Sequence, residues 1–215
     1  EAAINLDDFD EGMKKEAEYF IECLLNPQRE AMIHIFFGER AASKINDVPK
    51  ETPKMDVKKA GIIGSGTMGG GIAMCFANIG IPVHIVDQDE ENLKRGLSAI
   101  ERNYKFMVDR GRMTEEQKEK TFGLITSGLS YDDIFDVDIV IEAVYENLDL
   151  KLEIFKKLDE SVNENAILAS NTSGLDVDAL ADCTNRPEKV VGTHFFSPAN
   201  VMRLLEVVRG DKTSN

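Results

Sequence analysis

A glycine-rich turn between a short apolar run and a helix of small residues constrains the fold of this chain most strongly. Gly64-Ser65-Gly66-Thr67-Met68-Gly69 fits the pattern G-x-G-x-x-G and follows the apolar run Ala60–Ile63. A second apolar run, Val83–Val86, leads into Asp87, 23 positions after Gly64. The dinucleotide-binding pattern asks for an acidic residue about 20 positions on. The spacing therefore predicts a strand, a phosphate-binding turn, a helix and a second strand.

Each part of this motif has a physical role in holding a dinucleotide. Gly64 permits the tight turn, Gly66 lets backbone N–H groups approach a diphosphate, and Gly69 allows close packing of helix on strand. The helix N-terminus adds partial positive charge. Asp87 is expected to accept hydrogen bonds from the adenosine ribose and to repel the extra phosphate of NADP, so NAD is the expected cofactor. The predicted contacts at this end are Gly64, Gly66, Thr67, Met68, Gly69, Asp87 and Gln88.

The rest of the chain after residue 54 alternates apolar strand-like runs with helical patterns. Helical spacing is expected over Met68–Ile79, Glu90–Arg110, a short segment from Thr114, and Leu150–Leu158. Further strands are expected at Leu124–Thr126, Ile139–Ala143, Ala166–Ala169, Val190–Thr193 and Leu204–Val208. This alternation predicts an α/β fold of the Rossmann type, with a doubly wound, mostly parallel sheet.

A helical segment precedes this domain. Phe9–Leu25 and Pro27–Ile45 are predicted helices, and the polar stretch Val48–Lys54 contains two prolines, which is typical of a linker. The two helices are expected to carry too little apolar surface to form a stable domain alone. We therefore expect residues 1–54 to be a helical tail and linker, and residues 55–211 to be the dinucleotide-binding domain.

Composition excludes several classes of partner. A net charge of −14 argues against binding to nucleic acid, because the phosphate backbone would be repelled. The longest apolar runs are strand-sized, so no membrane span is expected. The three cysteines are far apart and odd in number, which suggests neither a disulfide framework nor a metal site and is typical of a reducing compartment.

One histidine and one glutamate lie where catalysis could use them. His194 follows an apolar run, where α/β sheets place their ligands, and histidine suits proton transfer near neutral pH. Glu206 lies within an apolar run, where an unpaired carboxylate would be costly. A His194–Glu206 pair would explain both positions, although a core histidine and a strand-edge glutamate remain the alternative. His34 and His84 lack such a setting and are expected to be structural.

From about Lys58 to Arg209 the sequence resembles the 3-hydroxyacyl-CoA dehydrogenase family. The resemblance is carried by the glycine motif, by Ser170-Asn-Thr-Ser173, by His194-Phe-Phe-x-Pro198 and by Glu206. It implies NAD-dependent oxidation of L-3-hydroxyacyl-CoA to 3-ketoacyl-CoA in fatty-acid β-oxidation. It also implies that His194 is the base and that Glu206 is its partner.

The same resemblance implies roles for further residues. Ser173 would hydrogen-bond the substrate oxygen and the cofactor side, and Glu146 and Lys151 match contacts to the nicotinamide ribose. Ser197 stands where mitochondrial single-function members have an asparagine that contacts substrate and cofactor. Two helix residues, Asn103 and Arg110, match positions that face the CoA moiety.

Several segments are similar to the peroxisomal bifunctional members of the family, in which a hydratase and a dehydrogenase share one chain. These are Leu175–Asp178, Phe195–Ala199 and, in the leader, Glu22–Leu25 and Phe36–Arg40. The similarity implies that residues 1–54 belong to an enoyl-CoA hydratase domain and that the location is peroxisomal. It further implies that the helical domain that follows in the family is absent, so that this fragment binds NAD but is weakly active alone.

Two other functions share this sequence pattern. A catalytically idle NAD-binding or structural protein, such as the lens crystallin that resembles this family, would keep the fold without the chemistry. A β-hydroxyacid dehydrogenase of the phosphogluconate type shares the glycine motif but uses a lysine base. The joint presence of Ser173, His194 and Glu206 favours the hydroxyacyl-CoA enzyme.

Overall fold

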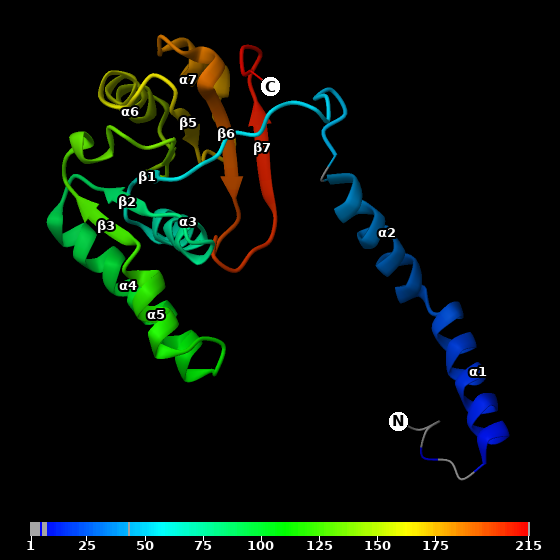
Figure 1. Cartoon of the computed structure of the whole chain (residues 1–215). Helices are drawn as coiled ribbons and strands as arrows, with labels where there is room; N and C mark the ends of the chain where they lie inside the picture. The colour runs from blue at the N-terminus through cyan, green and yellow to red at the C-terminus, as the bar shows by residue number, and fades with distance from the viewer. Residues whose placement is uncertain (1–4, 6–7, 43, 215) are drawn as a thin grey trace. The chain divides into compact units, whose positions relative to one another are not determined.

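The chain forms two units. The computed structural model describes residues 5, 8–42 and 44–214. Contacts between Cα atoms divide the chain into Glu1–Pro53 and Lys54–Asn215, and each unit is described by itself (Figure 1). No helix among the described residues is long and apolar enough to cross a membrane.

The first unit contains two helices, α1 (Phe9–Leu25) and α2 (Pro27–Ala42). The carboxylate of Asp8 caps α1 by accepting a hydrogen bond of 2.7 Å from the backbone N–H of Asp10. Asn26 separates the helices, and proline opens the second, where its missing N–H costs nothing. The sequence predicted α2 to continue to Ile45, but it ends at Ala42, and residue 43 lies outside the described residues.

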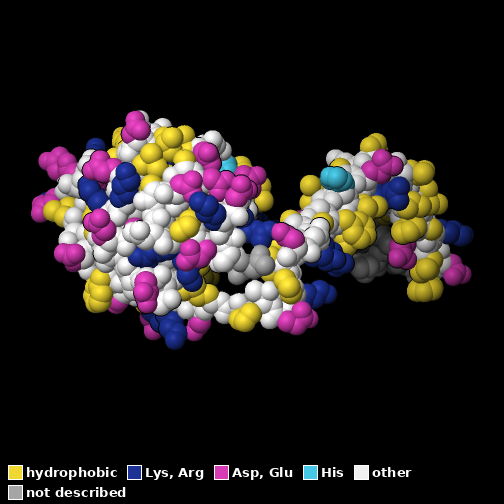
Figure 2. Space-filling view, turned by 90° about the horizontal axis from the view of Figure 1, so that it is seen from above, with side chains coloured by type: hydrophobic (Ala, Val, Ile, Leu, Met, Phe, Trp, Pro, Cys, Tyr) yellow, Lys and Arg dark blue, Asp and Glu magenta, His cyan; other side chains and the backbone are white. Residues whose placement is uncertain are grey.

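These two helices expose large apolar side chains, contrary to the expectation that they carry little apolar surface. Phe9 is 80% exposed, Leu25 77% and Met32 71%. Apolar side chains are visible over much of this unit in Figure 2. Among the described residues of α1 and α2, only Gly12 is buried, so the helices enclose no core of their own.

The second unit is built on a seven-stranded sheet with the strand order β3-β2-β1-β4-β5-β6-β7. Every neighbouring pair is parallel except β6 and β7, which are antiparallel. The strands are β1 (Ala60–Ile63), β2 (Val83–Val86), β3 (Ile125–Gly128), β4 (Ile139–Glu142), β5 (Ile167–Ser170), β6 (Val190–Phe195) and β7 (Leu205–Arg209). This confirms the Rossmann-type, mostly parallel sheet. The strand order reverses between β1 and β4, where such sheets bind ligands beyond the carboxyl ends of the strands.

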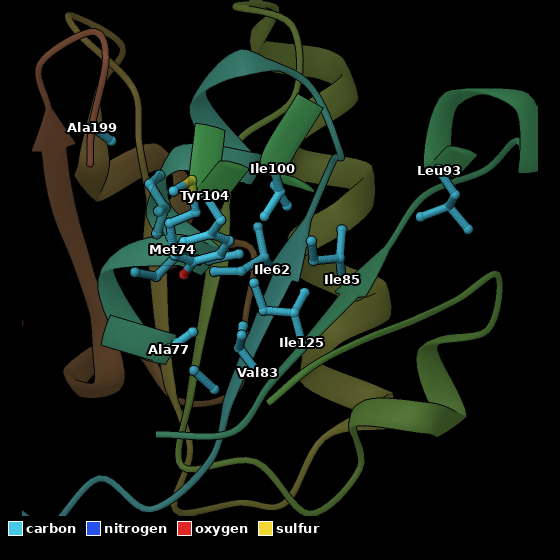
Figure 3. Close-up of a cluster of buried hydrophobic side chains, with 14 of the residues drawn as sticks. Ile62, Met74, Ala77, Val83, Ile85, Leu93, Ile100, Tyr104, Ile125 and Ala199 are labelled. Carbon is cyan, nitrogen blue, oxygen red and sulfur yellow. The ribbon is translucent and has the colours of Figure 1, made fainter. Parts of the chain in front are cut away.

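Helices cover both faces of the sheet because the central strands are apolar on both faces. The helices are α3 (Thr67–Asn78), α4 (Glu90–Asp109), α5 (Glu115–Phe122), α6 (Leu148–Ser161) and α7 (Val177–Asp182). On one face, Met74 of α3 and Tyr104 of α4 pack with Ile62 and Ile85 of the sheet (Figure 3). On the other face, helices α6 and α7 pack against the sheet through a second cluster that includes Phe155.

The structure adds to and corrects the predicted elements. Helix α7 and the two short 3-10 segments Tyr131–Ile134 and Pro187–Lys189 were not predicted. Strand β6 extends past Thr193 to include His194, because antiparallel pairing with β7 continues the hydrogen bonding. The expectation that Glu206 occupies a buried apolar strand is wrong, since every residue of β7 is exposed.

Candidate active site

The glycine turn joins the carboxyl end of β1 to the N-terminus of α3. Gly64 has a backbone φ of +98°, which residues with a side chain rarely adopt. A Cβ at this position would also lie 2.9 Å from the Ala143 carbonyl oxygen. A Cβ on Gly69 would lie 1.9 Å from the Gly64 carbonyl oxygen, so only glycine lets α3 pack so closely on the turn. Gly66 caps α3 with no atom within 4 Å of the place a Cβ would take. That open space fits the diphosphate of a dinucleotide.

Thr67 and Met68 form the first turn of α3. Thr67 is exposed beside the glycine turn, whereas Met68 is partly buried and packs against the core. After the neighbouring strand β2 ends, Gln88 is exposed directly after Asp87. All three therefore lie at the same edge of the sheet as the glycine turn.

Asp87 follows β2 and holds the glycine turn. One carboxylate oxygen accepts hydrogen bonds from the backbone N–H of Ser65 at 2.8 Å and from its hydroxyl at 2.7 Å. The other oxygen accepts a longer bond of 3.3 Å from Asn92. Burial by itself would raise the pKa of Asp87, but these hydrogen bonds outweigh it and hold that pKa below its ordinary value. Asp87 is therefore a fixed negative charge beside the turn.

His194 and Glu206 face each other across the antiparallel strands β6 and β7. Nδ1 of His194 lies 2.8 Å from a carboxylate oxygen of Glu206. The histidine side chain is 23% exposed and that of the glutamate 52%. Because a carboxylate only accepts, Nδ1 is the donor, which leaves Nε2 to exchange a proton with a ligand.

The Ser170–Ser173 segment brings polar groups from β5 toward the same edge. Glu146 accepts a hydrogen bond of 2.9 Å from the backbone N–H of Ser173 and a weaker one of 3.3 Å from its hydroxyl. Glu146 also accepts from the Thr172 hydroxyl at 2.5 Å. Burial would raise the pKa of Glu146, but the bonds from Thr172 and Ser173 and the nearby Lys151 lower it below its ordinary value. Glu146 is thus an ionised group that fixes Ser173.

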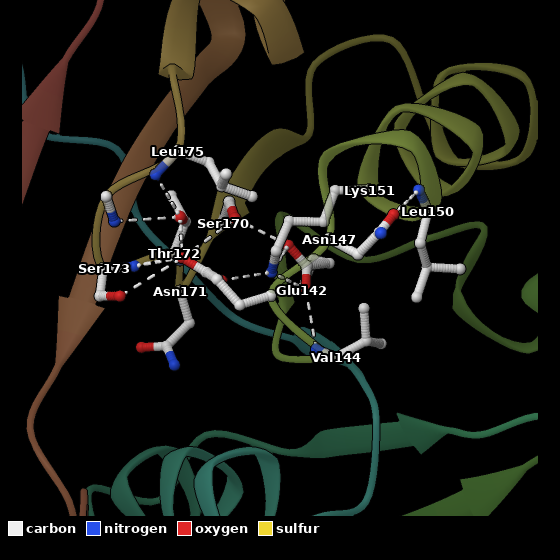
Figure 4. A network of polar contacts seen from close by, with 12 residues as sticks. Glu142, Val144, Asn147, Leu150, Lys151, Ser170, Asn171, Thr172, Ser173 and Leu175 are labelled. Atoms are coloured by element: carbon white, nitrogen blue, oxygen red, sulfur yellow. Dashed lines mark hydrogen bonds and ion pairs between the residues drawn. The ribbon is translucent and has the colours of Figure 1, made fainter.

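Lys151 lies deeper than the resemblance suggested. Its side chain is 1% exposed, and its ammonium lies 2.6 Å and 2.8 Å from the two carboxylate oxygens of Glu142. Glu142 also accepts a bond of 2.7 Å from the Ser170 hydroxyl. Figure 4 shows these side chains meeting between α6 and the end of β5. The sequence did not single out Glu142, which lay within the predicted strand Ile139–Ala143 as its one charged residue.

Asn171 links this segment to the histidine strand. Its side-chain oxygen accepts a hydrogen bond of 2.9 Å from the backbone N–H of Phe195, next to His194. Ser197 is exposed in the loop that follows β6. Asn171 is another residue whose contribution the sequence reading missed, and its position two residues before Ser173 was the available signal.

The two residues expected to face CoA lie on α4 and its end. Asn103 is exposed and contacts the sulfur of Met74 at 3.8 Å. The guanidinium of Arg110, which caps the helix, lies over the ring of Phe106, 4.8 Å from the ring centre. The described contacts of Asn103 and Arg110 are within this helical layer.

The two other histidines lie outside this site. His34 is exposed on α2. His84 lies on β2, where Nδ1 is 2.8 Å from the hydroxyl of Thr126 and burial lowers the pKa of the ring. The described contacts of His84 involve neither Asp87 nor the His194–Glu206 pair.

The fold and the site together define a class of protein, a dinucleotide-dependent dehydrogenase domain. Residues 59–215 match the family model for the NAD-binding domain of 3-hydroxyacyl-CoA dehydrogenase. The chain therefore belongs to the 3-hydroxyacyl-CoA dehydrogenase family and carries its NAD-binding domain, which confirms the resemblance seen in the sequence.

Relatives of this chain include plant and bacterial enzymes of fatty-acid oxidation. The chain is 41% identical over 204 residues to the peroxisomal fatty acid beta-oxidation multifunctional protein AIM1 of Arabidopsis thaliana, covering 94% of this chain and 28% of that protein. It is 38% identical over 205 residues to the fatty acid oxidation complex subunit alpha of a Psychrobacter strain, with 95% and 28% covered. The chain thus spans little more than a quarter of the length of these relatives.

Solved structures agree with the fold. The (S)-3-hydroxybutyryl-CoA dehydrogenase PaaH1 from Ralstonia eutropha is 40% identical with a TM-score of 0.73, covering 74% of this chain and 56% of that one. The dehydrogenase part of multifunctional enzyme 1 from C. elegans is 33% identical with a TM-score of 0.70, covering 80% and 40%. The similarity extends over most of the described chain.

Proposed function

We propose that this chain is the NAD-binding part of an enzyme that oxidises L-3-hydroxyacyl-CoA to 3-ketoacyl-CoA in fatty-acid β-oxidation. The observation that carries the proposal is the 2.8 Å contact between His194 and Glu206 in a domain with a glycine turn suited to NAD. A domain that only bound nucleotide would not need a histidine and a carboxylate in this arrangement. This pair is the reason to prefer an enzyme over an idle structural protein on the same fold.

The chemistry follows from the orientation of the histidine ring. Glu206 holds the tautomer with the proton on Nδ1, so Nε2 takes the proton from the substrate hydroxyl, and the carboxylate stabilises the resulting imidazolium. Bound NAD would accept the hydride from the carbon that bears this hydroxyl. Ser173 offers its hydroxyl to the substrate oxygen, and Ser197 lies in the adjoining loop. A lysine base is disfavoured, because Lys151 is buried against Glu142.

The parent protein is proposed to be a peroxisomal multifunctional enzyme. Three plant relatives are named as peroxisomal multifunctional proteins of fatty acid beta-oxidation, while similarly close bacterial relatives are named as subunits of a fatty acid oxidation complex. We infer that residues 1–54 connect the dehydrogenase domain to an enoyl-CoA hydratase domain, and that 3-hydroxyacyl-CoA passes between the two activities.

The proposal is tested by replacing the base. With acetoacetyl-CoA and the chain in excess over NADH, His194→Gln should slow NADH oxidation by about 10²–10⁴-fold, the usual value of general acid–base catalysis. NADH affinity should stay unchanged, and Glu206→Gln should act in the same direction but less severely. His34→Gln, at an exposed position on α2, is the matched control. A loss below about tenfold for His194→Gln would mean that His194 is not the base.

A further inference from the structure

Glu142 is a fully buried carboxylate for which the proposed reaction has no direct use. It ends β4, and its side chain has no exposed surface. One oxygen accepts from the backbone N–H of Val144 at 2.7 Å and from Lys151, and the other accepts from Lys151 and Ser170. These donors come from the loop after β4, from α6 and from the end of β5. One carboxylate therefore joins three separate segments.

Stability alone does not account for this pair. Removing two charges from water costs about as much as their attraction returns, so a buried ion pair is often no more stabilising than apolar residues of the same size. Glu142 and Lys151 also lie at the carboxyl ends of the strands, which is the ligand edge of such sheets. A role in arranging that edge fits the location better than a role in packing.

Lys151 connects Glu142 to Glu146, which is closer to the surface. Its ammonium has a third carboxylate oxygen, that of Glu146, at 3.4 Å. The opposite oxygen of Glu146 holds the backbone N–H and the hydroxyl of Ser173. The ammonium of Lys151, whose side chain is 1% exposed, therefore links Glu142 to Glu146.

Ser170 provides a second connection to the same turn. Its hydroxyl donates to Glu142 at 2.7 Å and accepts from the backbone N–H of Thr172 at 3.2 Å. Thr172 is itself buried and donates its hydroxyl to Glu146. The turn that carries Ser173 is thus held to Glu142 from two sides (Figure 4).

We propose that Glu142 and Lys151 are positioning residues that fix Glu146 and Ser173 for contact with the nicotinamide half of NAD. The inference rests on the proposed function for the orientation of the cofactor, with the adenosine half at Asp87. It makes Glu142 a determinant of cofactor affinity even though the carboxylate touches no ligand. It also makes this effect specific to one half of the dinucleotide.

The expected effect on the nicotinamide half alone can be tested directly with Glu142→Gln. Dissociation constants for NADH and for ADP, which lacks the nicotinamide half, are measured by calorimetry on the same preparations. Glu142→Gln should weaken NADH about tenfold, the usual effect of losing a charged hydrogen bond, and should leave ADP unchanged. Glu153→Gln is the control, since Glu153 is an exposed residue of α6 paired with Lys157, and it should change neither constant.

A second variant covers the case in which Glu142→Gln does not fold. Ser170→Ala keeps the ion pair but removes the hydroxyl that joins it to the turn, so NADH should weaken severalfold with ADP again unchanged. If NADH and ADP weaken equally, or if neither weakens in the folded variants, the positioning role is wrong while the proposed function stands. If the unmodified chain binds neither compound, the proposed function fails and the inference fails with it.

Discussion

Asp87 holds the glycine turn through Ser65, and we expect the same side chain to bind the adenosine ribose. One carboxylate oxygen accepts two short hydrogen bonds from Ser65, while the other accepts a longer one from Asn92. The second oxygen is therefore the one available to the adenosine ribose. Hydrogen bonds hold the pKa of this carboxyl below its ordinary value, so we expect its repulsion of an NADP phosphate to be independent of pH near neutrality.

Asp87→Ala should therefore narrow the preference for NADH over NADPH by at least about tenfold, because it removes both the ribose acceptor and the repelling charge. Titration of both nucleotides, followed by energy transfer from protein to nicotinamide, measures the ratio. Asp56→Ala removes the same charge from an exposed position and should leave the ratio unchanged. Equal affinities in the unmodified chain would contradict this account of Asp87.

Residues with a motif around them could be anticipated from the sequence, whereas residues defined by burial could not. The spacing of Gly64 and Asp87 pointed to a nucleotide site because the strand–turn–helix–strand unit places the acidic residue about 20 positions after the first glycine. Glu142 could not be singled out, since its partners come from α6 and β5 and meet only in the fold. Glu206 was expected near His194 on the argument of a buried strand, yet the two meet on an exposed edge.

Within the glycine turn, one glycine is expected to matter for the stability of the fold and another for the binding of NADH. A Cβ on Gly69 would collide with the Gly64 carbonyl, whereas a Cβ on Gly66 would meet no atom within 4 Å, so replacement by alanine should have different effects at the two positions. Gly69→Ala should lower the free energy of unfolding by about 1–3 kcal/mol or more through overpacking. Gly66→Ala should cost less than about 1 kcal/mol, as a loss at an N-cap, but should abolish tight NADH binding.

Chemical denaturation and NADH titration of both variants test this separation. Gly38→Ala, where a Cβ meets nothing within 4 Å on α2, is the control for the general effect of replacing a helical glycine. Gly66→Ala with normal NADH affinity would show that the diphosphate does not lie over this turn. An unchanged unfolding free energy for Gly69→Ala would show that α3 is less closely packed than described.

The strands were predictable because their apolar runs are short and bounded by turns, but helix α7 and the end of β6 were not. Helix α7 has six residues, fewer than two turns, so periodicity gives little signal. The end of β6 was also misplaced, since antiparallel pairing with β7 extends it past the apolar run. In both cases tertiary contacts decide the element, and a local pattern does not contain them.

At the scale of the whole molecule, carboxylates with lowered pKa make the fold sensitive to acid. The side chain of Asp159 is 5% exposed, and one of its carboxylate oxygens lies 2.7 Å from Nε of Arg186. Burial would raise the pKa of Asp159, but hydrogen bonds from Asn185 and Arg186 lower it below the ordinary value. Such a group stabilises the fold above its unfolded pKa of about 4, and this contribution is lost as pH falls through the folded value.

Asp159→Asn should therefore lower the Tm at pH 7, and this difference should shrink as pH falls below about 4, where the unfolded carboxyl becomes protonated and the folded one follows at lower pH. Thermal unfolding followed by circular dichroism at a series of pH values gives the two curves. A gap in Tm that stays constant from pH 7 to pH 3 would contradict the role given to the ionised carboxylate.

The exposure of the strand edge proposed to be catalytic predicts slow turnover by residues 1–215 alone. Strand β7, which carries Glu206, is exposed along its whole length, and Ser173 is exposed as well. Water then reaches the reacting groups and the substrate is poorly held, which can cost about 10²-fold or more in rate. NADH oxidation with acetoacetyl-CoA should be at least that much slower than for the Ralstonia eutropha enzyme at equal concentration. Comparable rates would show that this chain already makes a whole site.

One dinucleotide is expected to extend from the glycine turn to the His194–Glu206 pair. A crystal structure of the chain with bound NAD tests it directly and does not depend on turnover. The account predicts the diphosphate at the N-terminus of α3, the adenosine ribose at Asp87, and the nicotinamide ring beside Ser173 and His194. A nicotinamide ring bound away from the His194–Glu206 pair would contradict it.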